Sequence, residues 1–202
     1  GGFGDHHMAY IRSPLAVWRL PRAKKNRFAL IVQDRFEALL LSLGHEVKAP
    51  FVEHGPVDFV IDGDIRVQSK ARTRHAARPG VSLTLARMRL PGDFRLYQPD
   101  EFDVLLICIV EGSDCEGRED FIGFFLFPSA ELSSRRLLCH DKPGRAYLTV
   151  FPTDRKPRSK VSQADQLWQA KYYFDMSKLL RDPEHLRRFQ QVLAKCRTAT
   201  IG

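Results

Sequence analysis

Residues 55–70, GPVDFVIDGDIRVQSK, decide the fold of this chain. Two runs of strand-forming residues, Asp58–Ile61 and Ile65–Lys70, flank the tripeptide Asp62-Gly63-Asp64. Glycine supplies a positive φ and aspartate tolerates tight local conformations, so the tripeptide has the chemistry of a turn. The stretch therefore predicts a β-hairpin closed by a three-residue turn.

The register of this hairpin decides which side chains meet. A three-residue turn pairs Asp58 with Gln68, and Lys70 joins them because side chains two apart on a strand share a face. The apolar side chains of both strands fall on the other face, which can be buried. A two-residue turn would place Asp58 opposite Val67 and separate the polar group, so the prediction depends on the register.

Two interpretations of the polar face stay open. In the first, it is an ordinary solvated face of a strand pair. In the second, it binds a divalent metal ion, because Mg²⁺ takes hard oxygen ligands, often one or two carboxylates with waters. Asp58, the side-chain oxygen of Gln68 and the backbone carbonyl of Ser69 would then be the ligands. Lys70 would position, or help to deprotonate, an attacking water.

The set Pro56, Asp58, Gln68 and Lys70 resembles the core of the PD-(D/E)xK nuclease superfamily, in its Gln-x-Lys variant. The resemblance is closest to the branch with Holliday-junction resolvases and the homing endonucleases that have this core. It covers about residues 28–135, with an apolar helix before the motif and a Tyr-x-x-x-Glu-x-Asp stretch after it. It implies a Mg²⁺-dependent endonuclease acting on DNA, with Mn²⁺ able to substitute, that leaves a 5′-phosphate and a 3′-hydroxyl. It also implies a homodimer or higher oligomer, since two DNA strands need two sites.

A helix is expected before the hairpin. Between Phe28 and Leu43 large apolar residues recur at three- and four-residue spacing, and Gly44 follows as a C-cap. In the resembling family this helix carries a glutamate that faces the metal, and its place matches Gln33 better than Glu37. We expect Glu37 to face the site, because a second carboxylate would help to hold a dication beside the neutral Gln68. Gln33 remains the alternative.

Basic residues gather around the motif and in a later loop at 152–160. The net charge of +8 and the pI of about 9.5 favour a polyanionic partner, either nucleic acid or an anionic membrane surface. The nuclease resemblance implies DNA, whose phosphates such residues contact without reading sequence. The expected nucleic-acid-binding residues are Arg72, Arg74, Arg78, Arg87, Lys156 and Arg158.

The order helix, strand, hairpin, strand, strand predicts an α/β domain with a mixed central β-sheet flanked by helices. The resemblance implies a restriction-endonuclease-like core. The apolar runs Val104–Val110 and Phe121–Phe127 are typical of buried strands, and Asp103 before the first is expected to be structural. Helices over 163–180 and 183–196 are expected to close the chain.

We divide the 202 residues into four parts. Residues 1–8 have the composition of an expression remnant, 9–27 form a basic arm, 28–160 the nuclease-like core, and 161–202 a C-terminal helical extension packed on the core. No apolar run approaches the ~20 residues that span a bilayer, and no signal peptide is evident. We therefore expect a cytoplasmic protein with no membrane partner.

The function predicted from these residues is a divalent-metal-dependent DNA endonuclease. The neutral Gln68 weakens the ligand set and leaves an alternative open. In that alternative the chain is a catalytically weak or inactive DNA-binding protein of the same fold.

Overall fold

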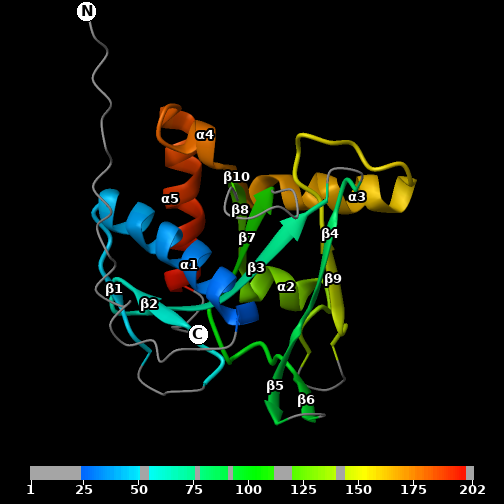
Figure 1. The fold of residues 1–202 in the computed structure, drawn as a ribbon, viewed down its shortest axis with the longest axis horizontal. Coiled ribbons are helices and arrows are strands. Elements are labelled where there is room, and N and C mark those ends of the chain that lie inside the picture. Colours follow the sequence, from blue (N-terminus) through cyan, green and yellow to red (C-terminus); the bar gives the residue numbers. More distant parts are fainter. Residues whose placement is uncertain are drawn as a thin grey trace, which may run out of the picture.

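The computed structural model describes residues 24–50, 55–75, 78–90, 93–111, 120–139 and 144–198. Its centre is a six-stranded sheet in the order β1-β2-β3-β7-β8-β10 (Figure 1). The β3–β7 pair is parallel and the other neighbouring pairs are antiparallel. The strands are β1 (Val47–Lys48), β2 (Phe59–Ile61), β3 (Ile65–Arg74), β7 (Val104–Glu111), β8 (Asp120–Pro128) and β10 (Tyr173–Asp175).

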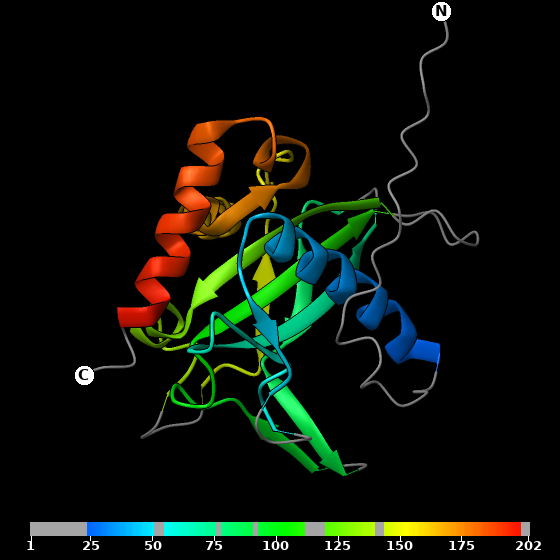
Figure 2. The same cartoon turned by 90° about the vertical axis from the view of Figure 1, so that its left-hand side faces the viewer.

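Helices cover both faces of this sheet, which confirms the predicted mixed α/β class. On one face lie α1 (Lys24–Ser42) and α5 (Pro183–Thr198), which meet over Phe124 of β8 (Figures 1 and 2). On the other face lie α2 (Ser129–Ser134) and α3 (Lys160–Gln169), whose Trp168 packs on Phe127. Among the described residues no helix is long and apolar enough to cross a bilayer.

The β2–β3 hairpin has the register that the sequence predicts. Its Cα pairs join Phe59 to Val67 and Ile61 to Ile65. At the turn, Asp62 has φ 52° and Gly63 has φ 83°, and the Asp64 amide donates to the Ile61 carbonyl at 3.2 Å. Two consecutive positive φ values match the right-handed twist of the strands, which is why the turn closes in this register.

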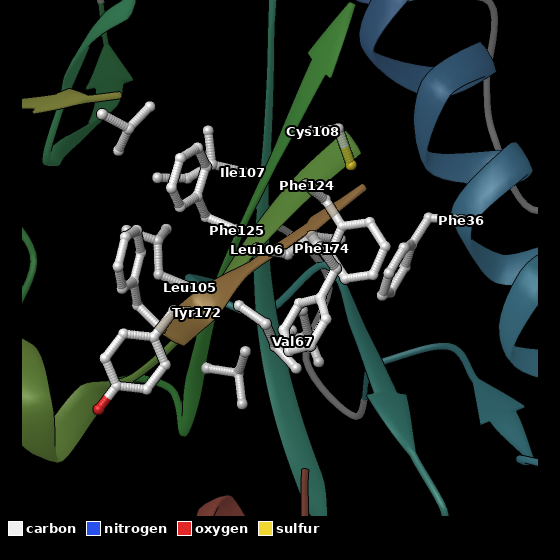
Figure 3. Packing of buried hydrophobic residues seen from close by; sticks show 14 of the residues in the cluster. Phe36, Val67, Leu105, Leu106, Ile107, Cys108, Phe124, Phe125, Tyr172 and Phe174 are labelled. Atoms are coloured by element: carbon white, nitrogen blue, oxygen red, sulfur yellow. The ribbon is translucent and has the colours of Figure 1, made fainter. Parts of the chain in front are cut away.

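The core lies on both sides of β7. Every residue of the predicted run Val104–Val110 is fully buried, as expected for a strand covered on both faces. On one face, Phe124 stacks on Phe174 and meets Phe36 of α1 edge-on (Figure 3). This packing fixes α1 to the Phe59 side of the sheet.

The predicted helix over 163–180 is wrong in its second half. Helix α3 ends at Gln169, a 3₁₀ turn follows (Ala170–Tyr172), and β10 then pairs with β8 before the short helix α4 (Met176–Leu179). The close approach of β10 requires glycine at 123, because a Cβ there would lie 2.7 Å from the Phe174 carbonyl oxygen. Edge pairing and aromatic burial thus outweigh the helical periodicity of the segment.

The pairing of four further strands into two small sheets was not predicted. One pairs β4 (Val81–Thr84) with β9 (Tyr147–Val150), and the other pairs β5 (Ala86–Leu90) with β6 (Asp93–Leu96). The β5–β6 ribbon extends away from the central sheet (Figures 1 and 2). The proposed remnant at 1–8 and most of the arm at 9–27 lie outside the described residues, and the domain boundaries stay a prediction.

Candidate active site

Three groups from the hairpin meet where β2 begins. The Asp58 Oδ2 atom accepts a hydrogen bond from the Ser69 amide at 2.7 Å and another from Gln68 Nε2 at 2.7 Å. The same Nε2 atom donates to the Ser69 carbonyl oxygen at 3.0 Å. A carboxylate oxygen and a backbone carbonyl oxygen therefore converge on one buried amide nitrogen.

This donor set has the chemistry that Mg²⁺ requires. The Asp58 carboxylate, the Ser69 carbonyl and the Gln68 amide all offer hard oxygen atoms. The amide of Gln68 now turns its nitrogen toward Asp58, so ligation through its oxygen requires rotation of that amide. Within the described residues no three His, Cys, Asp or Glu side chains are grouped as a metal site, so backbone and amide oxygens would carry much of the binding.

Lys70 lies two residues after Gln68 on β3, so both side chains are on the same face of the strand. Its Nζ atom donates to the Ala86 carbonyl at 3.3 Å and lies 5.0 Å from the centre of the Tyr97 ring. The pKa of Lys70 is lowered to about 8, chiefly by burial and to a smaller extent by the charge of Arg72, while the Asp58 carboxylate acts in the opposite direction. A substantial fraction of this amine is therefore neutral in mildly alkaline solution.

Gln33 and Glu37 are both buried on α1, and Gln33 Nε2 donates to Glu37 Oε1 at 2.9 Å. The neighbouring Phe36 packs against Phe59, with ring centres 6.3 Å apart, so α1 covers the apolar face of the hairpin. Lys70 points to the other face, toward Ala86. The structure pairs the two candidates with each other, and a ligand role for either one stays a prediction.

The basic residues named from the sequence have different surroundings. Arg78, Lys156 and Arg158 are exposed, whereas the side chain of Arg87 lies outside the described residues. Arg72 is half-buried, its Nη1 atom donates to the Ala71 carbonyl at 2.7 Å, and burial lowers its pKa. Three exposed cations and the half-buried Arg72 remain candidates for phosphate contacts.

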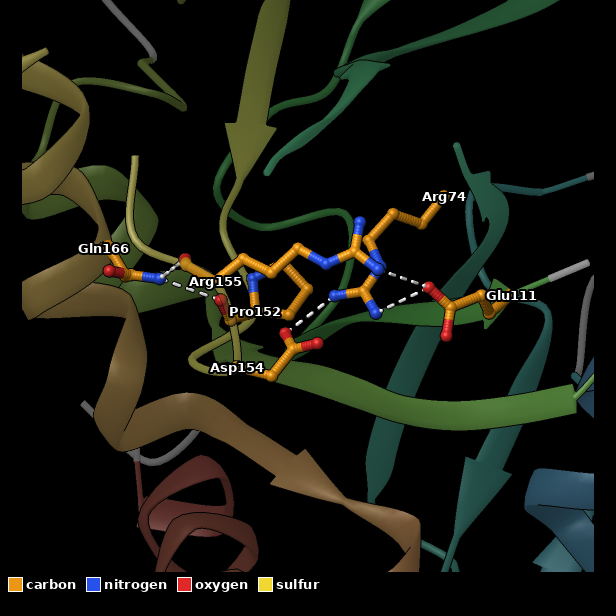
Figure 4. A network of polar contacts seen from close by, with 6 residues as sticks. All are labelled: Arg74, Glu111, Pro152, Asp154, Arg155 and Gln166. Atoms are coloured by element: carbon orange, nitrogen blue, oxygen red, sulfur yellow. Dashed lines mark hydrogen bonds and ion pairs between the residues drawn. The ribbon is translucent and has the colours of Figure 1, made fainter. Parts of the chain in front are cut away.

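Arg74 does not fit its predicted role. Its side chain is 2% exposed, and it donates to Asp154 Oδ1 at 2.6 Å and to Glu111 Oε1 at 2.9 Å (Figure 4). Arg155 adds a second contact to Glu111 at 2.9 Å. The sequence analysis named Arg74 as a nucleic-acid-binding residue, but β3 continues to residue 74 and carries this arginine into a buried ion-pair network.

Asp103 has the structural role that the sequence predicts. Its Oδ2 atom accepts from the Arg66 amide at 2.8 Å, and its Oδ1 atom accepts from Arg66 Nη2 at 2.9 Å. This carboxylate fixes the start of β7 beside β3. Sequence reasoning missed Tyr97 and Ala86 as neighbours of Lys70, although Tyr97 opens the Tyr-x-x-x-Glu-x-Asp stretch that it did identify.

Known proteins resemble this chain in fold but not closely in sequence. No protein-family model matches the chain, and no curated protein matches it. Among solved structures, the crystal structure of MepB is 20% identical, with a TM-score of 0.50, and the match covers 77% of this chain and 98% of that one. The structure of a bacterial homing endonuclease, I-Ssp6803I, is 18% identical, with a TM-score of 0.46, covering 73% and 93%.

Proposed function

We propose that the protein is a Mg²⁺-dependent DNA endonuclease. One observation carries the proposal. The Asp58 carboxylate and the Ser69 carbonyl lie 2.7 and 3.0 Å from the same atom, Gln68 Nε2, and Gln68 is on the strand that also presents Lys70. Oxygen ligands beside an amine of lowered pKa are the groups that hydrolysis of a phosphodiester needs.

In this proposal Asp58, Gln68 and the Ser69 carbonyl hold the ion, with Glu37 or Gln33 as a further ligand. When bound, Mg²⁺ would neutralise charge on the scissile phosphate and make an attacking water more acidic; Mn²⁺ would substitute for it. The backbone amide of Ser69 holds the Asp58 carboxylate in place at 2.7 Å. The Asp58 carboxylate is therefore oriented before DNA arrives, whereas the Gln68 amide would have to rotate to turn its oxygen toward the ion.

Lys70 acts on the nucleophile. Its neutral amine accepts a proton from the attacking water, and the resulting ammonium stands beside the charge that develops on the phosphate. The exposed cations Arg78, Lys156 and Arg158 would bind DNA phosphates and supply affinity without sequence preference. Cleavage of both strands would use two copies of the chain.

The test is plasmid nicking with Mg²⁺ or Mn²⁺ by the wild type, Asp58→Ala and Lys70→Ala. Glu184→Gln and Lys178→Met serve as matched controls, because both residues are exposed on the C-terminal helices. We expect both site variants to lose at least about 100-fold in rate while the controls keep wild-type activity. Equal nicking by the wild type and both site variants would remove the assignment.

A second function is favoured by the present geometry of Gln68. Its amide nitrogen stands between the two oxygens that would bind the ion, and its own oxygen is neutral. A protein that binds DNA without cutting it would keep this arrangement. Salt-dependent DNA binding with no cleavage under any divalent ion would establish this function in place of the first.

A further inference from the structure

We propose that Tyr97 is a positioning residue for Lys70, acting together with the Ala86 carbonyl at the base of the β5–β6 ribbon. The inference rests on the proposed nuclease function, since it explains how the amine of that site is held.

The ring of Tyr97 is fixed independently of Lys70. The residue is 3% exposed, its amide donates to the Leu85 carbonyl at 3.1 Å, and its ring meets Phe102 edge-on, with centres 5.4 Å apart. A ring held by a backbone bond and an aromatic neighbour presents a constant face to the amine 5.0 Å above it.

Ala86 and Tyr97 lie at the same end of the β5–β6 ribbon, its base, where β5 begins and β6 ends. Ala86 begins β5 and pairs with Leu96, the residue before Tyr97. The carbonyl of Ala86 accepts from Lys70 Nζ at 3.3 Å, so the amine is held from two sides by groups that the ribbon places together. The position of the lysine therefore depends on how the ribbon docks against β3.

These two contacts fix the direction of the Lys70 side chain. An aromatic face and a carbonyl attract an ammonium less strongly than a carboxylate does. Within the described part of the chain Lys70 forms a hydrogen bond to the Ala86 carbonyl and no ion pair, although the Asp58 carboxylate is near enough to act on its charge. The groups that hold the amine are therefore the Ala86 carbonyl and the Tyr97 ring, and the ribbon supplies both.

The experiment compares Tyr97→Phe, which keeps the ring, with Tyr97→Leu and Tyr97→Met, which keep an apolar side chain but lose it. Phe189→Leu is the matched control, because it removes a fully buried ring of α5 on the other face of the sheet and leaves Tyr97 and its neighbours unchanged. Two quantities are measured for each variant: the pH titration of the Lys70 side chain by NMR of lysine-labelled protein, assigned with Lys70→Met, and the pH profile of plasmid nicking.

In Tyr97→Phe we expect the Lys70 titration midpoint and the rate of plasmid nicking to stay close to the wild-type values. The Leu and Met variants should nick about 10-fold more slowly, with the Lys70 midpoint displaced by about half a pH unit or more. Phe189→Leu should lower the melting temperature and leave the Lys70 midpoint in place. The positioning role is wrong if the Lys70 midpoint and the nicking rate of the Leu and Met variants equal those of Tyr97→Phe. A displaced midpoint in a protein that never cleaves DNA would support the placement of the amine and reject the nuclease function.

Discussion

Lys70 and Arg74 lie four residues apart on the same face of β3, yet they have opposite surroundings. Arg74 is paired with Glu111 and Asp154, and Arg155 completes the network (Figure 4). Lys70 meets only a carbonyl and an aromatic ring among the contacts described. Burial opposes the charge of both, but the carboxylates outweigh it for Arg74 and raise its pKa, whereas the pKa of Lys70 falls to about 8.

Burial alone therefore does not show whether a cation stabilises the fold or is available for chemistry. The groups that contact the cation show it. Two carboxylates fix the charge of Arg74 and tie β3 to β7 and to the loop after β9. The contacts of Lys70 leave its proton exchangeable, which is what a general base requires. Each of the following predictions tests one side of this contrast.

The largest effect is expected from exchanging the two cation types. Lys70→Arg keeps a charge but cannot lose a proton, so we expect nicking to fall by at least about 100-fold. The reciprocal Arg74→Lys keeps a cation at a position outside the proposed site, and its nicking rate should stay within about 3-fold of wild type. Comparable losses in both variants would show that the two positions do not differ in function.

Arg74→Met should destabilise the fold. It leaves Glu111 and Asp154 without their buried partner, and we expect a loss of about 2 kcal/mol, discounted because both carboxylates are partly exposed. Arg74 lowers the pKa of Asp154 against the opposing effect of burial, so this stability is present above pH 4 and is lost as the pH falls through the folded-state pKa. Urea unfolding at pH 7 and pH 3 measures both quantities, and a constant difference between wild type and variant would contradict the ion-pair explanation.

Lys70→Met, unlike Arg74→Met, should stabilise the fold. The folded state disfavours the ammonium form, so the apolar variant is expected to be more stable at pH 7 by about 1 kcal/mol. Between the folded pKa of about 8 and the ordinary value of 10.5 the unfolded chain binds more protons, so wild-type stability rises with pH and the difference narrows. Thermal unfolding from pH 7 to pH 10 tests this, and a difference that widens with pH would refute it.

The exposed cations should show the smallest effects. Lys156→Ala and Arg158→Ala remove solvated charges, so we expect each to weaken DNA binding by about 3-fold. The slope of log K against log salt concentration should become less steep by about one in each variant. Unfolding free energies should stay within about 0.5 kcal/mol of wild type. Fluorescence anisotropy across a salt series measures binding, and an unchanged slope would place the DNA elsewhere on the surface.

The local features of the hairpin could be predicted from the sequence because they depend on neighbours in the chain. Asp62-Gly63-Asp64 sets the turn, the turn sets the register, and alternation then places Gln68 and Lys70 on one face. The buried strand at 104–110 followed from its continuous apolar run, since no polar position interrupts it. These inferences use only spacing and side-chain chemistry.

The failures lie where distant segments decide the outcome. The helical periodicity of 163–180 could not show that Tyr173–Asp175 would pair with β8, because that pairing depends on the space left by Gly123. The burial of Arg74 depends on Glu111 and Asp154, which lie 37 and 80 residues away along the chain. Pattern reasoning assigns a basic residue to the surface unless such a partner is known.

The hairpin, its register and the group Asp58, Gln68 and Lys70 follow from the order of residues alone, because a turn and a two-residue repeat are local properties. The burial of Arg74 in an ion-pair network and the contacts of Lys70 with Tyr97 and Ala86 follow only from the way distant segments pack. Protonation and pairing depend on which distant groups approach a side chain, and that approach is set by the packing of the whole sheet.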